Sequence, residues 1–521
     1  MDFDIAIIGS GFAGSLMAMI AQRIGFSVVL LERGQHPRFA IGESSTPLAN
    51  LYLEQLARRY ALPRLLPLTA WGPWQRERPE LACGLKRGFS FFHHQLDQPF
   101  SDDARRRHHL LVAASPRDDI ADTQWFRADF DQLLVDEARR CGVVFFDRTH
   151  VRLARAPAKK IPSHEPLEFD CERDGTKFSV RARFVIDASG PRGFLHRTLE
   201  LPEIAFPNLP RTEALYSHFC DVRPLEATLD AVATPPYEVE NAAVHHVFED
   251  GWIWLLRFNN GITSAGVVAT ERLARQLNFS KADAEKAWRR ILARLPTLQR
   301  QFRNARAVQP FFLLPHASFR SGRVVGKNWA LLPSTAGFVD PLLSTGFPLA
   351  LLGIARLAEI LESSWATDQL AAKLKTYERQ TFAELDTTEQ LVSALYANFS
   401  DFEIFAALSQ LYFAAASFSE ATLRLKQTSA TRLGFLLQSH PSFSTALSRC
   451  CRQARRPSAP KMRRSLLTNI HRAIEPINVA GLGDPARRNW FPVRGDDLLE
   501  GAGKLGVNKT AVKNFLQANG F

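Results

Sequence analysis

A glycine-rich loop near the start of the chain has the residue types and spacing of a dinucleotide site. It reads Gly9-Ser10-Gly11-Phe12-Ala13-Gly14, between a short β-branched strand over residues 4–9 and a helix expected over Phe12–Arg23. The first glycine allows a tight turn, the second lets a pyrophosphate approach, and the third lets the helix pack against the strand. Glu32 ends the next strand, 23 residues after Gly9, and its carboxylate can accept hydrogen bonds from ribose hydroxyls. The pattern predicts a bound dinucleotide cofactor.

Two other patterns do not fit the motifs that they resemble. Gly501-Ala502-Gly503-Lys504-Leu505-Gly506 follows Asp-Asp-Leu-Leu-Glu instead of a buried strand, and only 15 residues come after it. We therefore expect one dinucleotide site and no built-in NAD(P)H domain. Gly42-Glu43-Ser44-Ser45-Thr46 begins like a nucleophile elbow, but Thr46 stands where that turn needs glycine.

Neither cysteines nor histidines form a metal-binding pattern. The six cysteines are scattered without a CxxC pair, which also argues against a disulfide framework and suits a reducing compartment. Adjacent histidines at 93–94, 108–109 and 245–246 would point to opposite faces of a strand. The N-terminus lacks the positive charge of a signal peptide, and the apolar stretch 346–361 is too short to span a membrane. We expect a cytoplasmic protein with no metal and no membrane span.

The composition is that of a globular protein, with 46% apolar and 23% charged residues over 521 positions. A net charge of +12 would suit nucleic acid, an anionic membrane or an anionic ligand, and charge alone does not choose among them. We expect no nucleic-acid partner. The 38 phenylalanines favour core filling over an aromatic-lined pocket. Between Arg449 and Arg464 there are seven basic residues and no acid, which favours a solvated, partly mobile connection over an anion-docking surface.

The expected elements indicate an α/β fold with a doubly wound parallel sheet. The strand at 4–9, the helix at 12–23 and a strand over Phe26–Glu32 form a βαβ unit. Trp125–Cys141 has helical spacing, and strands follow at 143–146 and Val180–Asp187. The pattern is β-like from Asp230 to Thr270, helical over 347–361, and helical again after about residue 366.

Seven further segments, in order and spacing, resemble the FAD-dependent halogenases. They are HPRFAIGESSTP (36–47), CGLKRGFSFFHH (83–94), WFRADFDQLL (125–134), VIDASGP (185–191), HHVFEDGWIWLLRFNN (245–260), GFVDPLLSTG (337–346) and FSDFEIF (399–405). The resemblance covers about residues 2–425 and is closest to the halogenases of phenylpyrroles and of the tetracycline skeleton, within the wider flavin monooxygenase superfamily.

The resemblance implies a glutathione-reductase-type FAD-binding fold and a division of the chain. Residues 1–365 would form the FAD-binding and substrate module, with FAD parts at about 1–80, 120–200 and 315–365 and a β-rich substrate part at about 205–315. Residues 366–521 would form a helical C-terminal region with a basic tail.

The resemblance also implies the chemistry. A separate flavin reductase would supply reduced FAD, which with O2 and chloride or bromide yields hypohalous acid. That acid would reach Lys86 beside a small aromatic substrate, free or tethered to a carrier protein. Lys86 could hydrogen-bond hypohalous acid or form a chloramine, and burial among neighbouring phenylalanines could lower its pKa. The halide would lie against the amides of Thr345 and Gly346. The implied cofactor-binding residues, besides the glycine loop and Glu32, are Ser44, Arg127, Asp187, Gly190, Asp340, Pro341 and Gly346.

Two departures bear on the reaction. Relatives that act on tryptophan carry a glutamate where this chain has Leu343, which points towards a more electron-rich ring such as a phenol or pyrrole. The family signature WxWxIP becomes Trp252-Ile253-Trp254-Leu255-Leu256-Arg257, in which Trp252, Trp254 and Arg257 are expected in the wall between flavin and substrate. Arg257 in place of proline keeps two alternatives open: an FAD-dependent monooxygenase that hydroxylates an aromatic, and a non-catalytic flavin-binding assembly factor.

Overall fold

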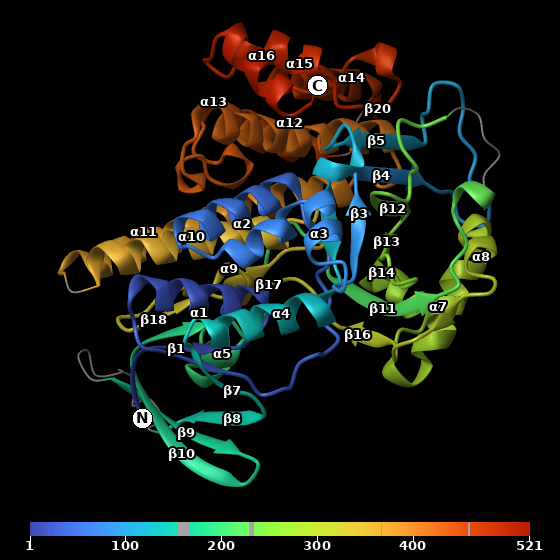
Figure 1. The fold of residues 1–521 in the computed structure, drawn as a ribbon. Helices are drawn as coiled ribbons and strands as arrows, with labels where there is room; N and C mark the ends of the chain where they lie inside the picture. Colours follow the sequence, from blue (N-terminus) through green and yellow to red (C-terminus); the bar gives the residue numbers. More distant parts are fainter. Residues whose placement is uncertain (155–165, 229–233, 366, 457–458, 521) are drawn as a thin grey trace.

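The computed structural model describes residues 1–154, 166–228, 234–365, 367–456 and 459–520. Figure 1 shows two separate sheets, with long helices stacked beside them and the C-terminal helices forming the upper layer of the view. The long elements predicted from hydrophobic periodicity are present, so the mixed α/β class is confirmed.

The first sheet has the strand order β7-β2-β1-β10-β9-β8, and β18 also pairs with β10. Its parallel core consists of β7 (Val144–Phe146), β2 (Val28–Leu31), β1 (Asp2–Ile8), β10 (Thr176–Asp187) and β18 (Trp329–Leu331). β9 (Leu167–Arg173) and β8 (Thr149–Leu153) extend it in antiparallel fashion. The carboxyl ends of the central parallel strands β1 and β10 meet at Ile8 and Asp187, which places the glycine loop beside the turn after β10.

The second sheet has the strand order β15-β11-β14-β13-β12-β4-β5-β20, and β16 also pairs with β11. Its members are β4 (Gly88–His93), β5 (His109–Ala113), β11 (Thr212–Cys220), β12 (Ala243–Phe248), β13 (Gly251–Arg257), β14 (Thr263–Thr270), β15 (Arg306–Ala307), β16 (Phe312–Leu314) and β20 (Trp490–Phe491). Residues 230–233 of the predicted β-like segment lie outside the described residues. The strand that follows Lys86 is β4, which pairs with β12 in this sheet. β12 in turn pairs with β13, so a single strand separates β4 from the tryptophans of β13.

Two small sheets connect the larger ones. β3 (Cys83–Lys86) pairs antiparallel with β6 (Asp122–Trp125), and β17 (Phe319–Arg320) pairs with β19 (Gly337–Phe338). The helices are α1 (Phe12–Ile24), α2 (Pro47–Arg59), α3 (Trp71–Glu77), α4 (Arg127–Arg140), α5 (Phe194–Thr198), α6 (Glu271–Gln276), α7 (Ala284–Ala293), α8 (Pro296–Gln301), α9 (Pro333–Ala336), α10 (Gly346–Ser364), α11 (Gln369–Tyr396), α12 (Phe402–Lys426), α13 (Pro441–Ala454), α14 (Pro460–Ile474), α15 (Gly495–Glu500) and α16 (Lys509–Ala518).

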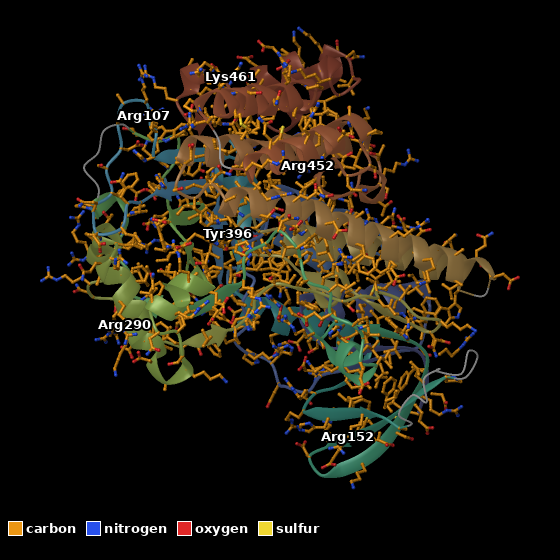
Figure 2. The ribbon with its side chains drawn as sticks, turned by 180° about the vertical axis from the view of Figure 1, so that it is seen from behind. Arg107, Arg152, Arg290, Tyr396, Arg452 and Lys461 are labelled. Carbon is orange, nitrogen blue, oxygen red and sulfur yellow. The ribbon has the colours of Figure 1, made fainter. Side chains whose placement is uncertain are left out.

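The basic C-terminal segment differs from its expectation. Its described residues lie mostly in α13 and α14, which each bury one apolar face, so a mobile connection is the wrong description for them. Figure 2 shows Arg452 of α13 and Lys461 of α14 in the upper part of the molecule. Spacing by three and four residues puts Leu447, Cys451 and Ala454 inside and leaves Arg449 and Arg452 exposed.

α12 is the one helix in the described part of the chain that is long and apolar enough to cross a membrane by length and composition. Of its most apolar window, 83% is buried inside the protein, which is the behaviour of a core helix.

A buried ion pair joins α10 to α11. Both guanidinium Nη atoms of Arg356 donate to the Glu384 carboxylate at 2.7 Å, and the Glu384 carboxylate also accepts the amide of Phe435. Arg356 is 6% exposed and Glu384 is 3% exposed. Burial lowers the pKa of Arg356, but the attraction of Glu384 outweighs it and the net shift is upward. Such a pair is costly to break on one side because the remaining charge stays buried.

We expect Arg356→Met to lower the free energy of unfolding by about 3–5 kcal/mol because it strands the Glu384 carboxylate. Arg59→Met is the matched control, since Arg59 also pairs with two glutamates but is half exposed, and it should cost about 1 kcal/mol or less. Urea unfolding of both variants measures the difference. Equal losses would show that the α10–α11 pair is not a buried-charge constraint.

Candidate active site

The glycine loop has the close packing that its spacing predicts. Gly9 has a φ of +99°, and a Cβ on Gly14 would lie 1.8 Å from the carbonyl oxygen of Gly9. Helix α1 therefore rests directly on the end of β1. A Cβ on Gly11 would meet nothing closer than the Arg127 guanidinium at 3.6 Å, so this side of the turn is open. Two further loop residues, Phe12 and Ala13, are buried in the first turn of α1.

Glu32 is held by the same loop. Its Oε2 atom accepts from the Ser10 amide at 2.9 Å, and its Oε1 atom accepts from the Gly34 amide at 2.7 Å. Burial disfavours the charged form, but the Arg38 guanidinium and the amide donors outweigh it, so the pKa of Glu32 lies below its usual value. Beside it, His36 Nδ1 and Arg38 Nε are buried without a hydrogen-bond partner in the described residues.

Arg127, the first residue of α4, contacts two segments that are far from it in the sequence. Its guanidinium donates to the carbonyls of Ile41 and Gly42 at 3.0 and 2.9 Å and lies 5.3 Å from the ring centre of Phe12. Its acidic partner is Asp131, at 2.7 Å, with both side chains buried.

Asp129, two residues after Arg127, has a different partner. Its carboxylate accepts from the amide of Ala82, the residue before β3. Positions i and i+4 share one face of α4, whereas i+2 does not, and this separates the two aspartates.

Aromatic contacts fix the glycine loop, α4 and α10 to one another. Phe12 meets Phe347 edge-on at 4.8 Å, and Trp125 stacks on both Phe347 and Phe130 at 4.3 and 4.1 Å. Rigid rings packed in this way hold the start of α10 close to Gly11.

The turn after β10 packs against the glycine loop at Gly9. Asp187 is fully buried, and its carboxylate accepts from the amides of Ser189 and Leu195 at 2.9 and 2.6 Å. These two hydrogen bonds fix the backbone of the turn. A Cβ on Gly190 would meet no atom within 4 Å, so the backbone is open there.

The residues present fit FAD. Gly11, Gly190 and Gly346 are all open to a Cβ-sized group, which leaves the backbone accessible to a ligand. Gly346 begins the 19-residue helix α10, and its first amides have no partners four residues earlier. Together with the unpaired polar atoms beside Glu32, these positions give a dinucleotide both space and donors.

Lys86 is fully buried at the end of β3. Its ammonium donates to the Ser44 hydroxyl at 2.8 Å and to the Ser45 carbonyl, and it lies 4.0 Å from the ring centre of Phe89. Burial lowers the pKa of Lys86, while the nearby Asp122 carboxylate raises it, and burial prevails. The predicted desolvation is thus present, with hydrogen bonds that the sequence did not indicate.

The 337–346 loop reaches the lysine through two serines. The Ser344 hydroxyl donates to the Ser44 hydroxyl at 3.0 Å, so Ser44 contacts both Lys86 and this loop. The amide of Ser344 donates to the carbonyl of Pro341, closing the turn before α10. Thr345 is the residue before α10 and makes no side-chain hydrogen bond to the helix among the described residues, and Leu343 is fully buried and apolar.

Asp340 anchors the same loop to the second sheet. Its Oδ2 atom accepts from the Tyr396 hydroxyl at 2.8 Å, and that hydroxyl accepts from Trp252 Nε1 at 3.0 Å. Burial raises the pKa of Asp340 to about 7. Tyr396, visible in the middle of Figure 2, also borders an open pocket of about 390 Å³ lined in part by Phe399 and Arg455.

β13 divides the predicted wall between two faces. Trp252 and Trp254 are buried on the face that packs against Phe91 and the helices, with Trp252 5.3 Å from His245. Ile253, Leu255 and Arg257 alternate onto the opposite face.

Arg257 is consequently not part of a wall with the tryptophans, contrary to expectation. Its guanidinium donates to the Glu240 carboxylate at 2.8 Å and to the Val222 carbonyl at 3.0 Å. This partly buried side chain thus has an acidic partner. Arg257, the residue that kept the monooxygenase alternative open, therefore lies on the face of β13 opposite the tryptophans.

The sequence did not indicate four buried groups near this site: Asp122, Asp131, Tyr396 and the Glu43–His218 pair. In that pair, Glu43 Oε1 lies 2.7 Å from His218 Nε2. Asp131 could have been found from its i+4 spacing to Arg127. The others depend on contacts between segments far apart in the chain, for which the sequence carries no spacing signal.

The second glycine pattern lies among the C-terminal helices. Gly501–Gly503 forms a short 3-10 helix after α15, with no strand before it. Within the described ranges, no group of three or more histidine, cysteine or acidic side chains could hold a metal ion.

Comparison with known proteins gives the family. The family model described as tryptophan halogenase matches residues 124–402, more than half of the chain. The chain belongs to the tryptophan halogenase family. It is 29% identical to monodechloroaminopyrrolnitrin halogenase of Pseudomonas fluorescens, over 79% of this chain and 70% of that protein. It is 28% identical to tetracycline 7-halogenase of Kitasatospora aureofaciens, over 80% of this chain and 73% of that protein.

A solved halogenase has the same fold. Halogenase PltM in complex with phloroglucinol and FAD superposes with a TM-score of 0.80 at 24% identity, over 93% of this chain and 99% of that one. The resemblance predicted from the quoted segments is confirmed. Membership of the tryptophan halogenase family makes the chain an FAD-dependent halogenase, and the monooxygenase and non-catalytic alternatives fit less well.

We expect Gly11→Val to lower FAD affinity by about 100-fold or more, because a side chain would fill the open approach to the loop. The FAD-free protein should keep its thermal midpoint, since no protein atom lies within 3.5 Å of the new Cβ. Gly503→Val, in the second glycine pattern, is the matched control and should bind FAD normally. Fluorescence titration with FAD, and with NADPH as a ligand expected not to bind, measures both. Normal FAD binding by Gly11→Val would contradict the assignment.

Proposed function

We propose that the chain halogenates an electron-rich aromatic of the phenol or pyrrole type, with hypohalous acid acting at Lys86. The observation that carries the proposal is a fully buried ammonium joined through Ser44 to Ser344, on the loop that leads into α10. A small neutral oxidant formed beside this loop would reach the Lys86 ammonium. The ring of Phe89 lies against that ammonium and packs on Phe413.

FAD would occupy a fold of the glutathione-reductase type. Gly9, Gly11, Gly14, Glu32 and Arg127 would hold its pyrophosphate and ribose, supported by the turns at Asp187 and Gly190. When bound and reduced, FAD supplies with O2 and halide the oxidising equivalent for halogenation. The amides of Thr345 and Gly346 would hold the halide at the positive end of α10, where the backbone at Gly346 is open. Asp340 and Pro341 would set the approach to that helix.

Lys86 would direct the halogen. As the ring carbon bonds to the halogen, the halogen–oxygen bond breaks and its electron pair stays on oxygen. The Lys86 ammonium gives that oxygen a proton, so water leaves. The resulting amine then takes the proton from the halogenated ring carbon, which restores the ammonium.

The substrate class rests on Leu343 and on the relatives. Leu343 offers no carboxylate to strengthen the lysine's action, which suits a ring that needs little activation. The relatives named above act on an aminopyrrolnitrin precursor or a tetracycline by their names, and PltM holds phloroglucinol, a phenol.

The remaining proposals concern partners and organisation. A separate flavin reductase would deliver reduced FAD, and the aromatic could be free or tethered to a carrier protein. The division into an FAD-binding and substrate module over 1–365 and a helical region over 366–521, and a cytoplasmic location, stay predictions.

Lys86→Met should bind FAD and oxidise reduced flavin at the wild-type rate, but lower halogenated product by about 100-fold or more, since it removes the acid from the halogenation step. Lys504→Met is the control, because Lys504 pairs with Glu475 on the surface and should not matter. Mass spectra of a phenol and pyrrole panel, with FAD, a reductase, NADH and bromide, give the readout. Half or more of wild-type halogenation in Lys86→Met would remove Lys86 from the reaction.

Trp254→Ala should raise the ratio of hydroxylated to halogenated product, because it opens the face of β13 that packs towards the helices. Arg257→Met should leave that ratio unchanged, since its side chain lies on the other face with Glu240. Comparison of +16 and halogenated mass peaks at one halide concentration tests both. A lower ratio in Arg257→Met would return Arg257 to the wall.

A further inference from the structure

A second buried charge accompanies Lys86. β3 and β6 pair antiparallel with Lys86 directly opposite Asp122, so the two side chains lie on the same face of this small sheet. Lys86 is 0% exposed and Asp122 is 6% exposed. Two ionisable groups of opposite sign thus face one buried space.

A chain of hydrogen bonds connects the two. Asn50 Nδ2 donates to Asp122 Oδ1 at 3.0 Å, and the Ser45 hydroxyl donates to Asn50 Oδ1 at 2.6 Å. The Ser45 carbonyl in turn accepts from the Lys86 ammonium. One residue therefore fixes the positions of both charges, because Ser45 binds the lysine with its backbone and the aspartate's partner with its side chain.

Asp122 keeps one oxygen unused. Its Oδ2 atom is buried and has no hydrogen-bond partner within the described residues. An unsatisfied buried acceptor costs about 1–3 kcal/mol, so packing alone does not explain a carboxyl group here.

Of the cationic side chains that act on Asp122, Lys86 is the one on the paired strand. The other titratable or charged side chains that face the pair are His245 on β12 and Tyr412, Glu420 and Arg424 on α12. Burial lowers the pKa of His245 to about 3, so it stays neutral. Glu420 opposes ionisation of Asp122, while Lys86 and Arg424 favour it.

We propose that Asp122 is a positioning residue for Lys86, whose carboxylate keeps the buried ammonium protonated at neutral pH. The inference rests on the proposed function, in which that ammonium gives a proton to the oxygen leaving hypohalous acid. Burial raises the pKa of the Asp122 carboxyl and lowers that of Lys86, so each charge depends on the other and the pair titrates together.

Asp122→Asn tests the proposal while keeping the side-chain volume and an oxygen for Asn50. Without the carboxylate, Lys86 should lose its proton at lower pH, and the alkaline limb of the halogenation profile should move to acid by about one unit or more. Glu420→Gln should move the same limb to higher pH, since Asp122 would ionise more readily. Asp129→Asn is the control, because Asp129 only accepts the Ala82 amide at the start of β3, and it should leave the limb in place.

A second readout needs neither FAD nor turnover. The 13Cε signal of Lys86 in lysine-labelled, FAD-free protein, assigned with Lys86→Met, gives its titration midpoint directly. Asp122→Asn should lower that midpoint by about one unit or more, and Asp122→Glu should restore it.

The outcomes separate the two levels of the argument. A titration midpoint and a pH limb that Asp122→Asn leaves unchanged would overturn the role of Asp122, as would a limb that moves to alkaline pH. Wild-type protein that yields no halogenated product would instead overturn the proposed function, whatever the titration shows.

Discussion

An ammonium group is stable inside a protein only where other parts of the chain supply its partners, and Lys86 imposes this requirement on the whole site. Its partners come from the segment after β2, from β4 and from the strand opposite it. A change in the packing of any one of these would expose or strand the charge. The lysine is therefore as much a structural constraint as a chemical group, and the fold is arranged around keeping it satisfied.

The same short segment serves a second buried cation. The carbonyls of Ile41 and Gly42 bind Arg127 beside the glycine loop, while Ser44 and Ser45 bind Lys86 beside the aromatic side chains. Residues 41–45 thus bind one cation on the cofactor side with their first two carbonyls and a second cation on the substrate side with Ser44 and Ser45. Only Glu43 lies between the residues that bind Arg127 and those that bind Lys86, so the two cations are positioned by one short stretch of backbone.

The sequence revealed features that depend on neighbours along the chain. The βαβ unit, the α4 helix and the glycine loop follow from periodicity and spacing, and Gly14 shows why the spacing is strict. It did not reveal Asp122 or Tyr396, because their roles arise where strands and helices distant in sequence meet. The basic residues between Arg449 and Arg464 misled for a related reason: charge density alone suggests a solvated connection, but alternate faces of α13 and α14 carry apolar side chains into the core.

The alternation of side chains along β13 has a consequence for how such proteins diversify. Trp252 and Trp254 belong to one surface of the strand, and Arg257 with Glu240 belongs to the other. The second face is buried as well, since Ile253 and Leu255 pack there in a separate apolar cluster and Arg257 has its own acidic partner. A change in the signature on that face can therefore be compensated by neighbours on the same face while the two tryptophans keep their packing.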